Sequence, residues 1–206
     1  MKIAVFGATG QTGRQVVRQA LDAGHEVTAV VRDPGRLNLS HDRLTIAPAD
    51  LFDPESIGPV VKGSDAVVSA LGASSREETT SVCAKGVRSM IEAGARRLVV
   101  VSNSAHTAAR GDSVLRRVFI RLLGRILKNP FDDLKRMEQQ IRSSDVEWTI
   151  VRPARLTNGA HTGRYRTATG GHVPSGWRIS RADVADLMLR SLRDETTIGE
   201  LVGVAY

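Results

Sequence analysis

Cysteine and long hydrophobic runs are scarce or missing in this sequence. Its 206 residues include one cysteine, Cys83, so the chain forms no disulfide with itself, which fits a reducing compartment. No apolar run approaches the ~20 residues that cross a membrane. The first residues lead directly into an apolar run without a signal-peptide pattern, so we expect a cytoplasmic protein with no membrane span. Cys83 falls in a predicted helix, which favours a small core residue over a nucleophile.

Aromatic residues are also few. They make up 4% of the chain, which is too little to supply stacking platforms for nucleic acid, and there is no zinc-finger spacing or RNA-binding signature. The five histidines show no metal-ligand spacing, so we predict no metal site. The net charge of +7 still favours anionic partners. With nucleic acid set aside, these are a phosphorylated cofactor or an acidic substrate.

A glycine-rich turn near the start is the most informative stretch. Residues 7–13 read Gly-Ala-Thr-Gly-Gln-Thr-Gly, between an apolar β-type run over residues 3–6 and a segment with helical periodicity. In that context the first Gly allows a tight turn, the second lets the backbone approach a pyrophosphate, and the third lets helix and strand pack closely. Amides at the helix N-terminus would hold the phosphate charge. A merely structural turn is the alternative.

Further apolar runs alternate with helical segments along the chain. The pattern predicts an α/β fold, a Rossmann-like doubly wound parallel sheet, in a single domain over residues 1–206. Ligands of such sheets bind beyond the carboxyl ends of the strands. The residues that we predict to bind a dinucleotide there are Gly7, Thr9, Gly10, Gln11, Thr12, Gly13, Arg32, Arg36, Asp50, Leu51, Leu71, Gly72, Ser102, Asn103 and Pro153.

The residues after the predicted strand 26–31 bear on the choice of cofactor. NAD sites place an acidic residue about 20 positions beyond the glycines, whereas this strand is followed by Arg32 and then Arg36. Guanidinium groups suit a 2′-phosphate, so we predict NADP rather than NAD. Two solvated loop arginines are the alternative, and Asp33 could contact the ribose instead. Asp50 could accept from the adenine amino group or cap the helix that starts at residue 54.

Two segments depart from the regular alternation. Residues 105–130 include a basic helix-like stretch from Arg116 to Lys128, which we interpret as a lid or edge helix, with a membrane-surface helix as the alternative. Asn129-Pro130 is expected to break it before a helix over residues 131–144, whose Lys135 either reaches the ribose or is solvated. Residues 155–178 are predicted to form a long loop on the substrate side, with one short strand around residues 164–167.

Four motifs together resemble a known family. They are Gly-Ala-Thr-Gly-Gln-Thr-Gly at 7–13, Val-Arg-Asp at 31–33, Ser-Asn-Ser-Ala at 102–105 and Thr-Ile-Val-Arg-Pro at 149–153. The chain is similar to the atypical short-chain dehydrogenases/reductases, the NAD(P)H-binding family that contains the flavin reductase also called biliverdin-IXβ reductase. The resemblance implies that residues 9–12 line the pyrophosphate, that Leu71 and Gly72 lie by the ribose, and that Pro153 lies near the nicotinamide. It places Ser104 at the hydride-transfer site.

Two departures from that family narrow the class of reaction that we expect the chain to catalyse. Typical short-chain enzymes protonate a carbonyl with the tyrosine of a Tyr-x-x-x-Lys pair. The two tyrosines here, Tyr165 and Tyr206, have no lysine four residues later, which argues against carbonyl reduction. Flavin reduction needs mainly the stacking of two rings. Arg155 stands where the flavin reductase carries a histidine, and it would bind an acidic or phosphorylated acceptor rather than move a proton.

The sequence therefore predicts an NADPH-dependent oxidoreductase that transfers a hydride to a flavin, tetrapyrrole or quinone-like acceptor. Ser104 and Arg155 are its predicted catalytic-site residues. One alternative is a non-catalytic NAD(P)-sensing regulatory protein, for which the basic segment 116–128 would be a partner surface. A second is an enzyme similar to nucleotide-sugar epimerases. Family precedent implies a monomer.

Overall fold

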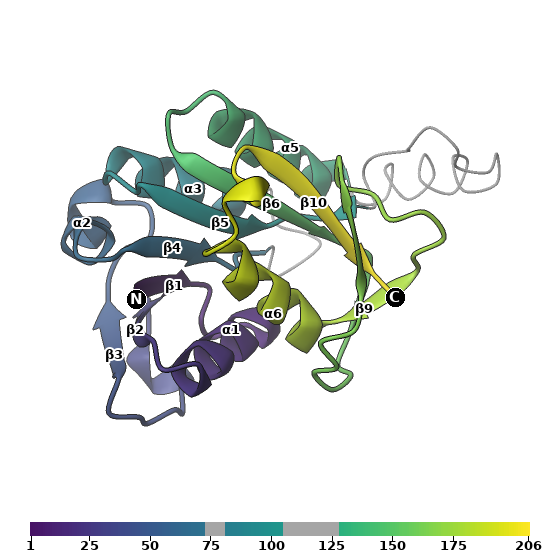
Figure 1. Ribbon diagram of the computed structural model, residues 1–206. Coiled ribbons are helices and arrows are strands. Elements are labelled where there is room, and N and C mark those ends of the chain that lie inside the picture. Colours follow the sequence, from purple (N-terminus) through teal and green to yellow (C-terminus); the bar gives the residue numbers. More distant parts are fainter. Residues whose placement is uncertain (73–80, 105–127) are drawn as a thin grey trace.

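The apolar runs between the helices form one eight-stranded sheet (Figure 1). This computed structural model describes residues 1–72, 81–104 and 128–206. Neighbouring strands run parallel, except at one edge of the sheet, where the outermost strand is antiparallel to its neighbour. In spatial order the strands are β3 (Leu44–Pro48), β2 (Glu26–Val31), β1 (Lys2–Phe6), β4 (Ala66–Ser69), β5 (Arg97–Val101), β6 (Glu147–Pro153), β10 (Glu200–Ala205) and β8 (Arg166–Thr169).

The direction in which strands are added reverses at β1. The chain passes from β1 outward to β2 and β3, then returns to place β4, β5 and β6 on the other side. The carboxyl ends of β1 and β4 therefore meet where two connections diverge, which is where open α/β sheets bind ligands. The predicted fold class, a doubly wound Rossmann-like sheet, is confirmed.

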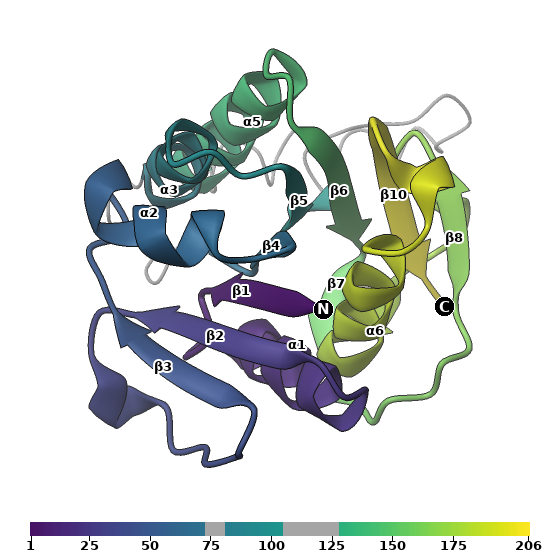
Figure 2. The ribbon, with the colours of Figure 1, turned by 60° about the vertical axis from the view of Figure 1, so that its left-hand side comes forward.

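Helices cover both faces of the sheet (Figure 2). One layer is formed by α1 (Gln11–Asp22) and α6 (Arg181–Ser191), and the other by α2 (Pro54–Lys62), α3 (Val82–Glu92) and α5 (Lys128–Arg142). Each layer has its own apolar core, since β-strand side chains alternate between the two faces. Buried residues such as Met188 and Ile57 each contribute about 1.5–3 kcal/mol to stability by leaving water.

Carboxylates cap α2 and α3. Asp53 accepts from the Glu55 amide (2.9 Å) at the start of α2, whereas Asp50 accepts from the Phe52 amide (2.9 Å). The alternative in which Asp50 caps this helix is therefore wrong, because Asp53 stands directly before Pro54. Buried Asp133 of α5 accepts from the Cys83 and Ala84 amides and caps α3 from another element.

The Cys83 thiol is buried beside that cap. Its exposed fraction is 2%, as expected for a core residue. Burial, helped by the negative charge of Asp133, raises the pKa of Cys83 to about 12. The thiol therefore stays protonated at neutral pH, which makes it a poor nucleophile.

Several predicted boundaries differ from those in the structure. The apolar runs over residues 66–71 and 147–151 each predict a strand; in the structure the first strand ends at Ser69 and the second continues to Pro153. The predicted break at Asn129-Pro130 is wrong: α5 already begins at Lys128, and a proline is tolerated in a first turn because amides there lack helical acceptors.

The predicted substrate-side loop contains more regular structure than its composition indicated. Its predicted strand at 164–167 is shifted to β8. Two further strands, β7 (Arg155–Thr157) and β9 (Arg178–Ser180), pair in parallel as a small second sheet. Short strands rich in Arg, Thr and Ser carry little hydrophobic alternation, so their pairing is not visible in the sequence.

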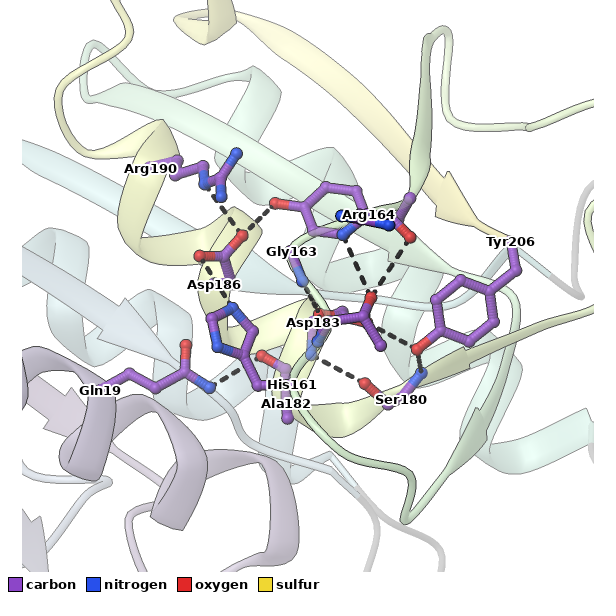
Figure 3. Close-up of polar contacts among 12 residues, drawn as sticks. Gln19, His161, Gly163, Arg164, Ser180, Ala182, Asp183, Asp186, Arg190 and Tyr206 are labelled. Atoms are coloured by element: carbon purple, nitrogen blue, oxygen red, sulfur yellow. Dashed lines mark hydrogen bonds and ion pairs between the residues drawn. The ribbon is translucent and has the colours of Figure 1, made fainter.

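A polar network fastens this segment to α6 (Figure 3). Asp183 accepts from the Thr162 amide (2.8 Å), the Gly163 amide (2.9 Å) and the Tyr206 hydroxyl (2.6 Å). Ser180 accepts from the Asp183 amide (3.0 Å) and so caps the N-terminus of α6. Burial alone would raise the pKa of Asp183, but the hydrogen bonds from Tyr206, Gly163 and Thr162 lower it to about 2.

We expect Asp183→Asn to destabilise the protein at neutral pH by about 2 kcal/mol, because an amide cannot accept on both sides as the carboxylate does. A carboxyl with a lowered pKa in the folded state stabilises above its unfolded value of 3.8 and loses this contribution as the pH falls towards 2. Urea unfolding should therefore show the difference from wild type shrinking between pH 4 and pH 2. Exposed Asp145→Asn is the control, and an equal effect of both variants would contradict the assignment.

Candidate functional site

The glycine turn brings three backbone segments together without room for side chains. Gly7 has a φ of +75°, and a Cβ built on it would lie 2.7 Å from the Ala70 carbonyl oxygen after β4. A Cβ on Gly13 would lie 2.1 Å from the Gly7 oxygen. The first turn of α1 is thus pressed against the carboxyl ends of β1 and β4. The positive φ of Gly7 fits the tight turn, and the close contact at Gly13 fits the packing of helix on strand, that the sequence predicts for the first and third glycines.

The N-terminus of α1 is left uncapped by side chains. Its N-cap residue is Gly10, whose amide donates to the Gly7 oxygen (3.0 Å). There is no side-chain cap and no acidic residue in the first turn, so the dipole and leading amides are not neutralised from within the helix. Such an end attracts an anionic group.

A surface cavity of about 230 Å³ lies beside this turn and is lined by Thr9, Arg32, Asp33 and Arg36. Asp33 accepts from the Gly35 amide (3.0 Å) at the start of a 3-10 turn, η1 (Pro34–Arg36). Within the described ranges neither Arg32 nor Arg36 has a carboxylate partner, and both are exposed. The cavity therefore presents two free guanidinium groups next to the glycine turn.

Arg14 holds the two walls of the cavity together. Its guanidinium donates through Nε to the Thr9 oxygen (3.2 Å) and through Nη2 to the Arg36 oxygen (2.7 Å). The glycine turn and the loop after β2 are thereby fixed relative to one another. Sequence reasoning did not assign Arg14 a role, because its partners are backbone oxygens 5 and 22 residues away.

A buried ionic network supports the ends of β5 and β6. Arg152 donates to both carboxylate oxygens of Glu138 on α5, one of them at 2.9 Å from Nε, and the Ser102 hydroxyl donates to Glu138 Oε1 (2.6 Å). Both charged side chains are 6% exposed. The sequence signal for this network is a glutamate, Glu138, among the apolar residues of α5. Because the Ser102 hydroxyl is already engaged, its role as a cofactor ligand remains a prediction.

Ser104 lies next to the end of β6. Its hydroxyl is buried and donates to the Pro153 carbonyl oxygen (3.0 Å), so residues 49 positions apart in the sequence meet here. The structure thus brings together two residues that the sequence placed at one site. The oxygen lone pairs of Ser104 can still accept a hydrogen bond.

The other predicted residues occupy the expected edge of the sheet. Asp50 and Leu51 follow β3, Leu71 and Gly72 follow β4, and Arg155 begins β7 after β6. Leu51 is buried in the core under α2 and α3. The predicted lid over 105–130 falls largely on residues 105–127, which lie outside the described residues.

Lys135 is exposed on α5 and forms an ion pair with Asp132 (3.6 Å). Phe131 stands four residues before it, the spacing at which the Tyr-x-x-x-Lys pair has its tyrosine, and Phe131 carries no hydroxyl. Sequence reasoning did not notice this position. In the described part of the chain no cluster of His, Cys, Asp or Glu could hold a metal ion, and no helix is long and apolar enough to cross a membrane.

The fold is that of an NAD(P)-binding protein with a Rossmann-like sheet. A family model described as NAD(P)H-binding matches residues 7–195, and the chain belongs to that family. It is 30% identical over 179 residues to the uncharacterized protein YwnB of Bacillus subtilis (strain 168), in a match that spans 81% of this chain and 78% of YwnB.

Solved structures agree with the family. A candidate NADH-flavin reductase from Streptococcus pneumoniae TIGR4 superposes with a TM-score of 0.78 at 27% identity, covering 100% of this chain and 99% of that one. A candidate epimerase from Bacteroides thetaiotaomicron has a TM-score of 0.80 at 24% identity, covering 100% and 96%. The second likeness is one of fold.

We expect Gly13→Ala to weaken NADPH binding at least ~10-fold and to lower the melting temperature, because its Cβ has no space against the Gly7 carbonyl. Calorimetric titration and thermal unfolding measure the two effects. Gly58→Ala in α2 is the matched control, since a Cβ there meets nothing within 4 Å and alanine favours a helix interior by about 1 kcal/mol. Unchanged NADPH affinity in Gly13→Ala would show that the turn does not hold the cofactor.

Proposed function

We propose that this protein is an NADPH-dependent reductase that passes a hydride to a flavin or a similar planar acceptor. The residues present fit the cofactor: the glycine cradle at Gly7 and Gly13 leaves backbone exposed where a Cβ would intrude, and the N-terminus of α1 is uncapped. When bound, NADPH supplies the hydride. The chain contributes binding, orientation and exclusion of water.

The preference for NADPH over NADH rests on the cavity beside the glycine turn. Arg32 and Arg36 face it with no carboxylate partner among the described residues, and Asp33 is engaged as the cap of η1. A dianionic 2′-phosphate would replace solvent around two guanidinium groups, which form strong charge-assisted hydrogen bonds with phosphate. An acidic residue free to bind the ribose hydroxyls is what an NAD site would need instead.

The observation that carries the choice of acceptor is the engagement of both tyrosines. The Tyr206 hydroxyl donates to Asp183 and the Tyr165 hydroxyl to Asp186, both on α6. Burial and the bond to Asp186 raise the pKa of Tyr165 above its usual range. Neither phenol is available as the acid that carbonyl reduction requires, while hydride transfer to a flavin needs mainly aligned rings.

Ser104, Pro153 and Arg155 have distinct proposed roles. The Ser104 hydroxyl donates a hydrogen bond to the Pro153 carbonyl oxygen. Its own oxygen can therefore accept a hydrogen bond from an amide N–H such as that of the nicotinamide carboxamide. Pro153 ends β6 beside that position. Arg155 is exposed at the start of β7 and binds negative charge on the acceptor, because an arginine stays protonated. Segment 155–178 therefore borders the acceptor.

We expect Arg32→Ala to weaken NADPH binding by about 10- to 100-fold, the cost of one hydrogen bond to a charged group, while NADH binding changes little. Parallel titrations with the two cofactors measure the difference. Arg18→Ala, an exposed arginine on α1, controls for the loss of one positive charge. Equal losses of NADPH and NADH affinity in Arg32→Ala would rule out the 2′-phosphate contact.

We expect the wild-type protein to oxidise NADPH faster than NADH when FMN, riboflavin or a quinone is supplied, as followed by the loss of NADPH absorbance. Ser104→Ala should lower kcat by about 10-fold, because a lost orienting contact misplaces the reacting ring, while NADPH affinity is kept. Tight NADPH binding without turnover on any acceptor would contradict the reductase. It would favour the alternative, an NAD(P)-sensing regulatory protein.

A further inference from the structure

Arg14 is a cation at an unfavourable place in the fold. With Gly10 as the N-cap, Arg14 is the fourth residue of α1, and its amide donates to the Gly10 oxygen (2.9 Å). The positive end of the helix dipole disfavours a cation there and favours an acidic side chain, which the first turn of α1 does not have. Arg14 is half-buried, and among the described residues no carboxylate forms an ion pair with it. The position of this charge therefore needs an explanation other than helix stability.

The hydrogen bonds of its guanidinium supply one. Nε donates to the Thr9 oxygen (3.2 Å) in the glycine turn, and Nη2 donates to the Arg36 oxygen (2.7 Å) at the end of η1. One planar group with its donors in a fixed fork thus bridges the segments that follow two neighbouring strands, β1 and β2. Thr9 and Arg36 both line the cavity beside the glycine turn, so the bridge joins two of its walls.

The turn that carries Arg36 depends on this bridge. Turn η1 is a single 3-10 turn without a buried residue. Its other hydrogen bonds are local, such as those from the Gly35 amide to the Asp33 carboxylate (3.0 Å) and from the Arg36 amide to the Asp33 oxygen (3.2 Å). In the ranges that the structure describes, the bond from Arg14 is the hydrogen bond that ties η1 to another helix or strand.

The backbone of Arg32 is held in a different way. Arg32 directly follows β2, whose last residue, Val31, accepts from the Ala49 amide (3.1 Å) beside it. The sheet therefore fixes this backbone without help from Arg14. Of the two guanidinium groups that line the cavity, the one whose backbone Arg14 holds is that of Arg36.

We propose that Arg14 is a positioning residue that sets the preference for NADPH over NADH by holding Arg36 in place against the glycine turn. A side chain whose backbone is fixed before the ligand binds loses less conformational freedom on binding, which raises affinity. The bridge also fixes the position of this guanidinium relative to the N-terminus of α1, so that one cofactor reaches both. This inference rests on the proposed use of NADPH and adds a residue that acts through the backbone of another.

The test titrates the full chain with NADPH and with NADH in a calorimeter. We expect Arg14→Gln to lower the NADPH-to-NADH affinity ratio about 10-fold, because a mobile Arg36 loses most of its hydrogen bond to the 2′-phosphate. A shorter pair of probes, adenosine 2′,5′-bisphosphate and 5′-AMP, lacks the pyrophosphate and the nicotinamide. The affinity ratio of this pair should fall in the same way, which locates the change at the 2′-phosphate.

Arg14→Lys separates the bridge from the charge. A lysine keeps the positive charge but ends in a single ammonium group, which cannot span the two carbonyl oxygens as the guanidinium fork does. We therefore expect the affinity ratio to fall in Arg14→Lys nearly as far as in Arg14→Gln. Arg18 is exposed one turn further along α1, so Arg18→Gln and Arg18→Lys are the matched controls. Both should keep the ratio within about 2-fold of wild type, because an exposed charge at that distance is screened.

A double-mutant cycle shows whether Arg14 acts through Arg36. Once Arg36→Ala has removed that guanidinium, we expect Arg14→Gln to change the affinity ratio by no more than about 2-fold, because residues that act through one contact are not additive. The ratio compares two ligands on the same protein, so a loss of stability alone does not move it. Thermal unfolding of each variant measures that stability separately.

A wild-type preference for NADPH that Arg14→Gln leaves intact would overturn the inference and leave the use of NADPH standing. A ratio restored by Arg14→Lys, or an equal fall in the Arg36→Ala background, would show that Arg14 acts by its own charge and would also overturn it. Equal affinity of the wild type for both cofactors would remove the NADPH preference and the inference with it. Selectivity that depends on Arg14, with no NADPH oxidation on any acceptor, would keep the inference and remove the reductase.

Discussion

The contact between the first turn of α1 and the ends of β1 and β4 is the constraint on which the site depends. Backbone at Gly13 meets backbone at Gly7, and Gly7 in turn meets Ala70, so no side chain can separate these segments. The N-terminus of α1 is held at the reversal point of the sheet as a result. Helix α6 packs on α1, where Gln19 donates to the Ala182 carbonyl (2.9 Å). The glycine turn at the start of α1 is thereby joined, through α1 and α6, to the segment after β7 that Asp183 of α6 holds.

Buried charge fixes the part of this edge at the ends of β5 and β6. The pair of Glu138 and Arg152 costs desolvation, and such pairs are weak sources of stability. Here the carboxylate also accepts from Ser102, so three elements, α5, β5 and β6, are held in one register at the strand ends. Removing the Arg152 charge would leave Glu138 buried with Arg142, at 3.6 Å, as a remaining cationic partner, so we expect the loss to destabilise this edge. The network specifies the position of the loops that carry Ser104 and Pro153 more than it adds to the free energy of unfolding.

The same molecule shows why local patterns predicted the sheet and not these networks. Apolar runs and glycine spacing are local, so the strand–turn–helix at residues 2–22 and the order of later elements could be read from sequence. The cap of α3 by Asp133 joins residues about 50 positions apart, and the partners of Glu138 lie 14 and 36 positions away. For the network around Glu138, the available signal in the sequence was a charged residue among the apolar Leu134, Met137 and Ile141. For β7 and β9, three-residue strands of mixed polarity offered none.

Two exposed arginines stand at the carboxyl edge of the sheet. Arg32 follows β2 and Arg155 follows β6, four strand intervals away, or about 19 Å at the usual strand spacing. The glycine turn and the Ser104–Pro153 contact lie between them. In the proposed reductase, that spacing would suit two ligands that each carry an anionic group at the outer end and a conjugated ring at the inner end. With both anions held apart by their arginines, the two rings would meet in the middle, where no charged side chain is needed. In such an arrangement the chain aligns the reactants and leaves the redox chemistry to them.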